Sequence, residues 1–109
     1  MTQTRKALRA TVFVGDSHQY HHRPVYTEIV HRAHAAGLAG VTVLHGVEGF
    51  GASTRIHQPH LLRLSQDLPM IVLIVDEPDK VRRFLPQIDE LVKAGMIFLD
   101  EVTVVAPVT

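Results

Sequence analysis

The sequence predicts an α+β domain of the ferredoxin-like class, with the order βαββαβ and both helices on one face of a four-stranded antiparallel sheet. Three observations predict it. Short β-branched runs alternate with two stretches of helical spacing, and glycine or proline marks most of the junctions between them. A chain of 109 residues is long enough for one hydrophobic core and too short for two. We therefore expect residues 1–109 to form one domain with a core over about residues 8–105.

The first half of the chain supplies two strands and a helix. Leu8–Val14 is apolar or β-branched and stops at a Gly-Asp-Ser turn sequence, which predicts the first strand. A helix is expected to begin at Pro24 and end at Gly37, since its apolar residues recur every three or four positions. The second strand is expected over Val41–Val47.

The second half supplies two further strands and the other helix. Met70–Val75 predicts the third strand. The second helix has Pro78 in its first turn, Asp76 or Glu77 as its cap, Pro86 inside it and Gly95 at its end. Its apolar residues fall on one face; they are Val81, Phe84, Leu85, Ile88, Leu91 and Val92. A final extended segment covers 96–99 and 102–105, and an interruption is expected at Asp100-Glu101.

The third predicted strand is apolar on both of its faces. Helices would cover only one face of the sheet, and the other face would meet water. Since no further chain is left to cover it, we expect another copy of the same sheet to do so, and hence an oligomer.

Charge and composition exclude several classes of protein. Eleven basic residues balance eleven acidic ones, so no field attracts nucleic acid. The longest apolar run, 70–75, is far shorter than the roughly 20 residues that cross a bilayer. There is no cysteine, and the basic start does not resemble a signal peptide. We expect a cytoplasmic protein without a cofactor.

A connection of 18 residues, 50–67, joins the second and third strands. Hairpin connections normally have two to five residues, and much longer connections are usually either functional or disordered. Gly49-Phe50-Gly51 stands at the start of this loop, and its glycines either permit close approach of the backbone to a ligand or simply end the strand before it. Ser53, Thr54, Arg55 and His57 beside them could hold an anion.

The eight histidines offer a different chemistry. His18, His21 and His22 cluster before the first helix, and His31 and His34 lie three residues apart on it. Imidazole pairs at such spacing can bind zinc, copper or nickel, although no cysteine or fixed carboxylate completes a ligand set. The Asp16-Ser17-His18 turn is similar to the nucleophile block of GDS-type esterases, but no histidine follows His60 and the chain has no asparagine, so a plain turn is favoured.

Several segments resemble the nitrogen-regulatory PII signalling proteins, and more closely a PII-like family known as domain of unknown function 190. The shared segments are Pro24-Val25-Tyr26, the Ala-Gly-Leu-Ala-Gly of 36–40, Gly40-Val41-Thr42-Val43, the Gly-Val-Glu-Gly-Phe-Gly of 46–51, Arg55-Ile56-His57, the Leu-Ser-Gln-Asp-Leu-Pro of 64–69 and Gly95-Met96-Ile97-Phe98. Together they span roughly residues 8–105.

The resemblance implies a homotrimer whose sheets face inward and which binds an effector, such as an adenine nucleotide, in clefts between subunits. It implies an effector site made of Thr42, Gly49, Phe50, Gly51 and Ser53, to which we add Arg55 and His57 as the expected cations. Loop 50–67 would then engage a partner such as a transporter or an enzyme. Met96 stands where PII proteins have a lysine, so an anion would instead meet Arg55, Arg63 or His57.

Two functions therefore follow from the sequence. The first is a non-enzymatic trimeric regulator, and the alternative is a metal-responsive protein of the same fold that uses its histidines. No complete catalytic constellation is present in the sequence.

Overall fold

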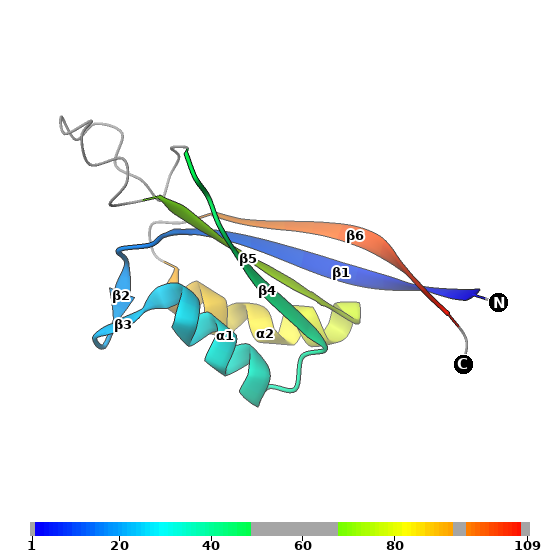
Figure 1. Ribbon diagram of the computed structural model, residues 1–109. Helices are drawn as coiled ribbons and strands as arrows, with labels where there is room; N and C mark the ends of the chain where they lie inside the picture. Colours follow the sequence, from blue (N-terminus) through cyan, green and yellow to red (C-terminus); the bar gives the residue numbers. More distant parts are fainter. Residues whose placement is uncertain (1, 49–67, 93–95, 108–109) are drawn as a thin grey trace.

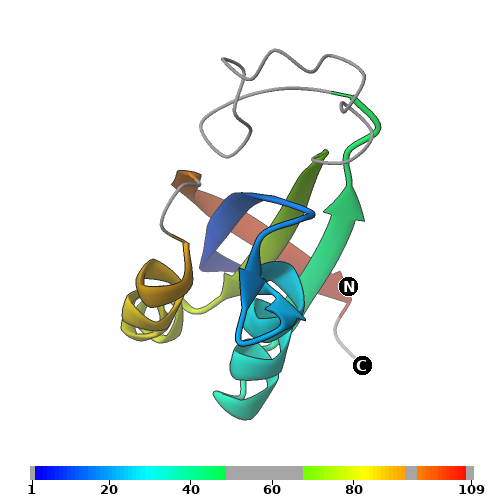
Figure 2. The ribbon, with the colours of Figure 1, turned by 90° about the vertical axis from the view of Figure 1, so that its left-hand side faces the viewer.

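The computed structural model describes residues 2–48, 68–92 and 96–107 (Figure 1). Four strands form an antiparallel sheet in the order β4-β5-β1-β6. Their bounds are Thr2–Gly15 for β1, Gly40–His45 for β4, Pro69–Asp76 for β5 and Met96–Pro107 for β6. Helices α1 (Val25–Ala35) and α2 (Pro78–Leu91) lie side by side on one face of the sheet (Figure 2). The predicted ferredoxin-like α+β class is confirmed.

The core fills the layer between the sheet and the two helices. Val12 of β1 lies opposite Val72 of β5, and neither side chain is exposed. The helices contribute apolar stripes at the predicted spacing, with Ile29 from α1 and Ile88 from α2 fully buried. Burial of this kind is the main favourable contribution to folding, and it fixes which face of each strand points inward.

Helix α1 ends close to the predicted place, and its last turn shows why. Gly37 adopts φ +75°, a conformation that favours glycine. Its amide donates to the His34 carbonyl at 3.1 Å, and the amide of Leu38 donates to the Ala33 carbonyl at 3.1 Å. These two bonds form a Schellman motif, which satisfies carbonyls that the helix leaves without a partner.

The ends of α2 differ from the prediction. Glu77 is the N-cap residue but makes no side-chain capping bond. The buried carboxylate of Asp76 instead accepts the amide of Glu77 at 2.7 Å and the amide of Ala39 at 2.9 Å, so it ties β5 to the turn before β4. The helix runs through Pro86 and ends at Leu91, before Gly95, which lies outside the described residues.

Strands β1 and β6 are longer than predicted. Strand β1 begins at Thr2 and not at Leu8, because residues 2–7 pair with the last residues of β6. Strand β6 is continuous through Asp100-Glu101, so the predicted interruption is wrong. Residues 2–7 and 102–107 therefore form a two-stranded ribbon that extends past the end of β5, which stops opposite Leu8 (Figure 1).

A small hairpin was not predicted. Strands β2 (Gln19–Tyr20) and β3 (Arg23–Pro24) pair across a turn made of His21 and His22, which have φ 51° and 68°. Positive φ at both central residues is the type I′ geometry of two-residue hairpins, and histidine is one of the non-glycine residues that tolerate it. The second predicted strand, β4, ends at His45 and not at Val47. The amide of Gly46 makes one further bond to the carbonyl of Pro69, the residue opposite it, and Pro69 has no amide hydrogen with which to continue the ladder.

Candidate functional site

The predicted effector site is only partly described. Thr42 lies on β4, where it is exposed on the sheet face opposite the helices. The other predicted site residues lie outside the described residues, as does the predicted loop 50–67; they are Gly49, Phe50, Gly51, Ser53, Arg55 and His57. What the structure does describe is the base from which that segment leaves the sheet.

The base is formed by the ends of β4, β5 and β1. The amide of Gly46 donates to the Pro69 carbonyl at 2.8 Å, and the amide of Asp16 donates to the Leu68 carbonyl at 3.0 Å. A Cβ added to Gly46 would lie 2.8 Å from Cγ and 2.9 Å from the carbonyl oxygen of Pro69. The two ends of the segment are therefore held close together, and only glycine fits at position 46 without a shift.

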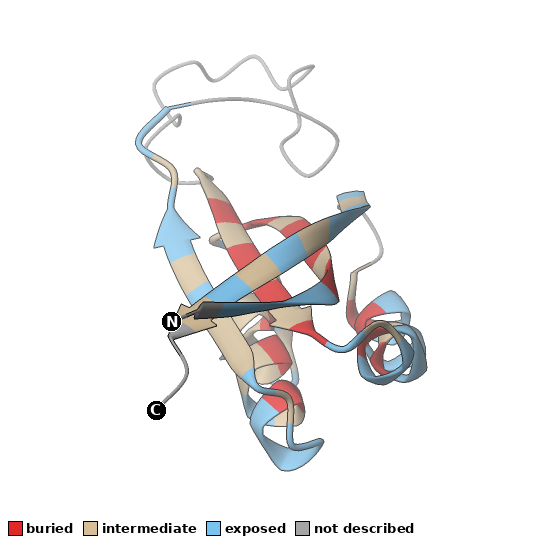
Figure 3. Cartoon of the chain, turned by 90° about the vertical axis from the view of Figure 1, so that its right-hand side faces the viewer, coloured by how far each residue is buried: buried red, intermediate tan, exposed pale blue. Residues whose placement is uncertain are grey.

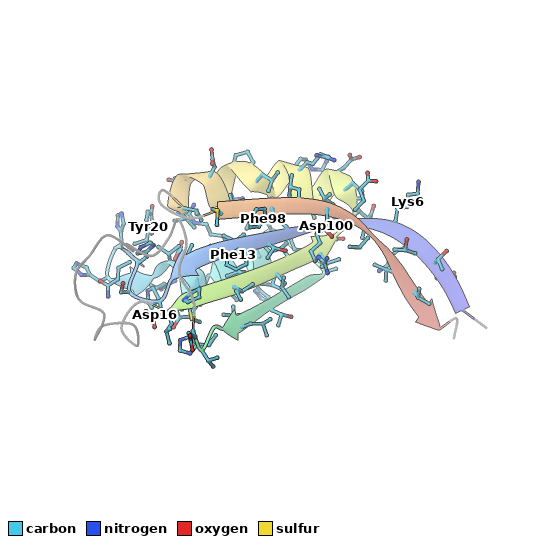
Figure 4. The ribbon with its side chains drawn as sticks, turned by 90° about the horizontal axis from the view of Figure 1, so that it is seen from above. Lys6, Phe13, Asp16, Tyr20, Phe98 and Asp100 are labelled. Carbon is cyan, nitrogen blue, oxygen red and sulfur yellow. The ribbon has the colours of Figure 1, made fainter. Side chains whose placement is uncertain are left out.

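An acidic side chain and an imidazole meet at this base. The Asp16 Oδ2 atom lies 3.5 Å from the His45 Nε2 atom, and Asp16 comes from the turn after β1 (Figure 4). The other carboxylate oxygen of Asp16 is buried and has no hydrogen-bond partner among the described residues. Protonated His45 would form an ion pair with Asp16 across the end of β5.

This contact bears on the Asp16-Ser17-His18 segment, for which the sequence favoured a plain turn. The Asp16-Ser17-His18 segment is a turn in which the His18 amide donates to the Gly15 carbonyl at 3.2 Å, and Asp16 points to His45. The His18 carbonyl accepts the amide of Val25 at 2.9 Å, so this stretch leads into α1.

The described histidines do not assemble into a metal site. Over residues 2–48, 68–92 and 96–107, no group of three or more His, Cys, Asp or Glu side chains could hold a metal ion. The Nδ1 atom of His31 instead lies 2.7 Å from the Arg23 Nη1 atom, and the ring of His21 lies 4.3 Å from the ring of Tyr20. The metal-responsive alternative has no ligand set in this part of the chain.

An arginine network joins the two helices, and no pattern in the sequence pointed to it. Arg32 of α1 contacts Glu90 of α2 at 2.7 Å and Glu28 of its own helix at 2.9 Å. Its guanidinium also lies 5.2 Å from the ring centroid of Tyr20. The hydrogen bonds to Glu90 and Glu28 raise the pKa of Arg32, and the bond from Arg32 lowers the pKa of Glu28. This network is structural, because every cation in it already has an acidic partner.

The sheet face opposite the helices is largely apolar, and we call it the open face (Figure 4). The registers place Ile71, Leu73 and Val75 of β5 there, with Phe13 of β1 and Phe98 of β6 beside them. The rings of Phe13 and Phe98 make an edge-to-face contact with centroids 5.7 Å apart. The open face thus carries apolar side chains on its central strands, as the two-faced third strand predicted, with Thr11 and the Arg9–Asp100 ion pair among them.

Comparisons with protein families and sequences give one consistent answer. The family model DUF190, described as "Uncharacterized ACR", matches residues 7–104. A UPF0166 protein of Aquifex aeolicus (strain VF5) is 34% identical over 101 residues, which cover 93% of this chain and 93% of the relative. A UPF0166 protein of Methanocaldococcus jannaschii is 27% identical over 97 residues, which cover 88% of this chain and 89% of the relative.

Solved structures share the fold. The apo form of CPII, a nitrogen regulatory PII-like protein from Thiomonas intermedia K12, aligns with a TM-score of 0.61 at 12% identity and covers 98% of this chain and 100% of its own. CPII bound to ADP, AMP and bicarbonate aligns with a TM-score of 0.63 at 12% identity, over 94% of this chain and 98% of its own. A PII-like signaling protein from Thermus thermophilus gives 0.63 at 13% identity, over 93% and 91%.

Proposed function

Because the chain belongs to the DUF190 family of PII-like proteins, we propose that it is a non-enzymatic regulatory protein that binds an adenine nucleotide between copies of itself. The observation that carries this proposal is the shared fold with CPII, which has been solved bound to ADP, AMP and bicarbonate. A nucleotide-responsive regulator is therefore the function that this fold supports best.

The proposed site lies where the segment after β4 leaves the sheet. Gly46 and Pro69 hold the two ends of that segment together, and Thr42 lies earlier on β4. In the proposal, Gly49, Phe50, Gly51 and Ser53 bring backbone amides and a hydroxyl to the phosphates, and Arg55 and His57 supply positive charge.

Cations on that segment matter because the last strand has none. Strand β6 contains no lysine or arginine between Met96 and Pro107. Three of the six described arginines are committed to acidic partners; Arg9, Arg23 and Arg32 pair with Asp100, Glu28 and Glu90. The other three lie on β1 and α2, not on β4. A phosphate that bound near β4 would therefore depend on Arg55, Arg63 or His57 for charge-assisted hydrogen bonds.

The proposal includes the assembly and a partner. Three copies associate through their open faces. Segment 50–67 contacts a protein partner, such as a membrane transporter or an enzyme, and reports to it whether the nucleotide is bound. Neither described helix combines the length and the apolar character needed to cross a bilayer.

The test is calorimetric titration of the purified protein with ADP, AMP and ATP, each with and without bicarbonate. We expect one of the nucleotides to bind. Gly51→Val should abolish that binding, because a β-branched side chain blocks positive φ and close approach of the backbone. Arg55→Ala should weaken binding by about 1.5–3 kcal/mol, the contribution of a charge-assisted hydrogen bond.

The matched control is Arg82→Ala, which removes an exposed arginine of α2 that has no acidic partner among the described residues. It should bind nucleotide as the unaltered protein does. Unchanged affinity in both Gly51→Val and Arg55→Ala would place the nucleotide elsewhere, and no binding of any nucleotide would refute the proposed function.

A further inference from the structure

The short hairpin of β2 and β3 is held to the rest of the molecule by polar contacts more than by burial. Each of its strands has two residues, and none of the side chains from Asp16 to Pro24 is buried. A hairpin of this size is only marginally stable by itself. It lies beside the start of α1 (Figure 2). Its position therefore depends on the side chains that join it to this helix.

Arg23 of β3 makes the polar contact to α1. Its Nη1 atom donates to Oε1 of Glu28 at 3.1 Å and lies 2.7 Å from Nδ1 of His31. Glu28 and His31 are three residues apart and therefore lie on the same side of the helix. This side is exposed or half-buried, whereas the buried residues of α1 face the sheet (Figure 3). One guanidinium nitrogen of the hairpin is thus shared by two side chains of α1.

The contact between Arg23 and His31 determines the proton state of the imidazole. A guanidinium group has five N–H donors and no acceptor. Nδ1 of His31 must therefore accept the hydrogen bond at 2.7 Å, which places the ring proton on Nε2. A protonated imidazole has hydrogens on both nitrogens and a positive charge, so it cannot accept this bond and would repel Arg23. The contact exists only while His31 is neutral.

Glu28 is the acid for which a protonated His31 would compete. The hydrogen bond from Arg32 is the largest cause that lowers the pKa of Glu28, and the charges of Arg23 and His31 act in the same direction. Glu28 therefore stays ionised between about pH 5 and 8, where imidazole groups change charge. Its Oε2 atom binds Arg32 at 2.9 Å, whereas its Oε1 atom binds Arg23. An imidazolium at position 31 would compete with Arg23 for Oε1.

Other charged and titratable groups lie on the elements that pack around this part of α1. They are Tyr20, His21 and His22 on the hairpin, Tyr26, Arg32 and His34 on α1, Glu90 on α2 and His45 on β4. Arg32 is already paired with Glu90 at 2.7 Å. In the described part of the chain, Glu28 is the one acid that contacts Arg23. No second anion is therefore available to Arg23 when His31 takes up a proton.

We propose that protonation of His31 at Nδ1 releases the β2–β3 hairpin from α1. The proton occupies the atom to which Arg23 donates, and the imidazolium then competes with Arg23 for Glu28. The hairpin keeps Tyr20 on α1, whose ring centroid lies 5.2 Å from the Arg32 guanidinium. Because imidazole changes charge between about pH 5 and 8, the hairpin is docked at neutral pH and released in mild acid.

This response to pH goes beyond the proposed nucleotide binding, because it uses neither Thr42 nor any other residue of the predicted effector site. The hairpin connects the turn after β1 to the start of α1, where the amide of Val25 donates to the His18 carbonyl at 2.9 Å. Its release would change the surface at this end of the molecule and leave the four-stranded sheet paired.

Hydrogen exchange of backbone amides, measured by mass spectrometry, tests the release. Exchange is followed at about pH 7.5 and about pH 5.5, and each rate is divided by that of the unfolded chain at the same pH. We expect protection of peptides that cover residues 16–26 to fall roughly fivefold at the lower pH, the effect of losing one exposed charged contact. Peptides from β5 should keep their protection.

His31→Asn is the decisive variant, because its side-chain oxygen can replace Nδ1 as an acceptor and does not take up a proton in this pH range. The hairpin should then be equally protected at both pH values. His31→Lys places a permanent positive charge at the site and should leave the hairpin poorly protected at both. Protection of β5 in the same samples shows that each variant is folded.

The matched control is His34→Asn, which alters another exposed histidine of α1 whose side chain has no hydrogen bond or ion pair among the described residues. It should lose protection in acid as the unaltered protein does. The double variant His21→Asn, His22→Asn tests the turn, since asparagine also tolerates the positive φ of these positions. It should keep the response to acid as well.

Equal protection of the hairpin at the two pH values in the unaltered protein would overturn the proposal. A full response to acid in His31→Asn would also overturn it, and its loss in the double variant would then assign the response to the turn histidines. Neither outcome bears on nucleotide binding, which is measured separately by calorimetric titration at neutral pH.

Discussion

Arg9 and Asp100 lie directly opposite each other in the β1–β6 ladder and form a two-pronged ion pair. The Nε atom of Arg9 donates to Oδ1 at 3.1 Å, and Nη2 donates to Oδ2 at 2.7 Å. This hydrogen-bonded contact raises the pKa of Arg9. The pair explains how β6 accommodates Asp100, because the two charges neutralise each other on the open face (Figure 4). Glu101 lies opposite Leu8, on the other face of the strand, where it is exposed.

Asp100→Asn should weaken the assembly more than it weakens the fold. In the single chain both side chains are nearly half exposed, so losing the ion pair there has little effect. In the proposed trimer the open face is covered, and an unpaired Arg9 would lose its hydration without a partner. Sedimentation at decreasing concentration should show earlier dissociation for this variant, with an unchanged thermal midpoint at high concentration. Glu101→Gln on the other face should dissociate as the unaltered protein does.

Substituting aspartate at two adjacent positions of β5 should cause two different defects, one in folding and one in assembly. Ile74 faces the helices and has no exposed surface, whereas Leu73 is half-buried on the open face. Ile74→Asp places a charge in the core, which costs several kcal/mol, and should leave the chain unfolded. Leu73→Asp should keep the circular dichroism spectrum of the fold but run as a monomer. A folded trimer in the Leu73→Asp variant would contradict assembly through the open face.

Acid should destabilise the helix layer partly through Glu28. The hydrogen bond from Arg32 lowers the pKa of Glu28 below its ordinary value of 4.5 in the folded chain. The Glu28 carboxylate therefore binds a proton more readily in the unfolded chain than in the folded one. The contribution of the Glu28–Arg32 contact to the free energy of unfolding is complete above about pH 4.5 and is lost as the pH falls through the lowered pKa. Urea unfolding at a series of pH values should show a shallower loss of stability below pH 4.5 for Glu28→Gln. If the free energy of unfolding fell equally steeply with pH in both proteins, this role of the Glu28–Arg32 ion pair would be excluded.

Gly46→Ala should disturb the base of the segment that follows β4. The new Cβ would lie 2.8 Å from Cγ and 2.9 Å from the carbonyl oxygen of Pro69, so the backbone must move. We expect the free energy of unfolding to fall by about 1–3 kcal/mol, as in other overpacked sites. Gly40→Ala is the control, because its Cβ would meet only the Val75 carbonyl, at an ordinary 3.7 Å. The thermal midpoints of the two variants should differ by several degrees. Equal midpoints would mean that Pro69 shifts to relieve the close contact at little cost in free energy.

The fold class and the central elements were predictable because each is determined by neighbours in sequence. The spacing of Val81, Phe84 and Ile88 predicts the buried stripe of α2, and these side chains are buried. Gly37 predicts the end of α1, since a local backbone conformation decides it. The alternating burial of β5 follows from a strand that is apolar on both faces and has helices on one side.

Elements that depend on a distant partner were missed. Residues 2–7 look polar and basic, and they become part of β1 only because 102–107 lie beside them. Strand β6 is likewise unbroken because of a distant partner, since Asp100 in its middle pairs with Arg9 of β1. The hairpin of β2 and β3 was missed because its turn uses two histidines at positive φ in place of the Asn-Gly that usually signals it.

The order of residues along the chain was enough to establish the fold class, the two-faced apolar strand and the family, because local periodicity and a long run of shared segments carry that information. Strand pairing was needed to learn which side chains share a face. It decided which of Leu73 and Ile74 points to the helices, and it showed that the exposed apolar residues gather on β4 and β6. The physical reason is that strand pairing is a non-local interaction. The order β4-β5-β1-β6 depends on contacts between residues up to about a hundred positions apart, and no local pattern in the chain records them.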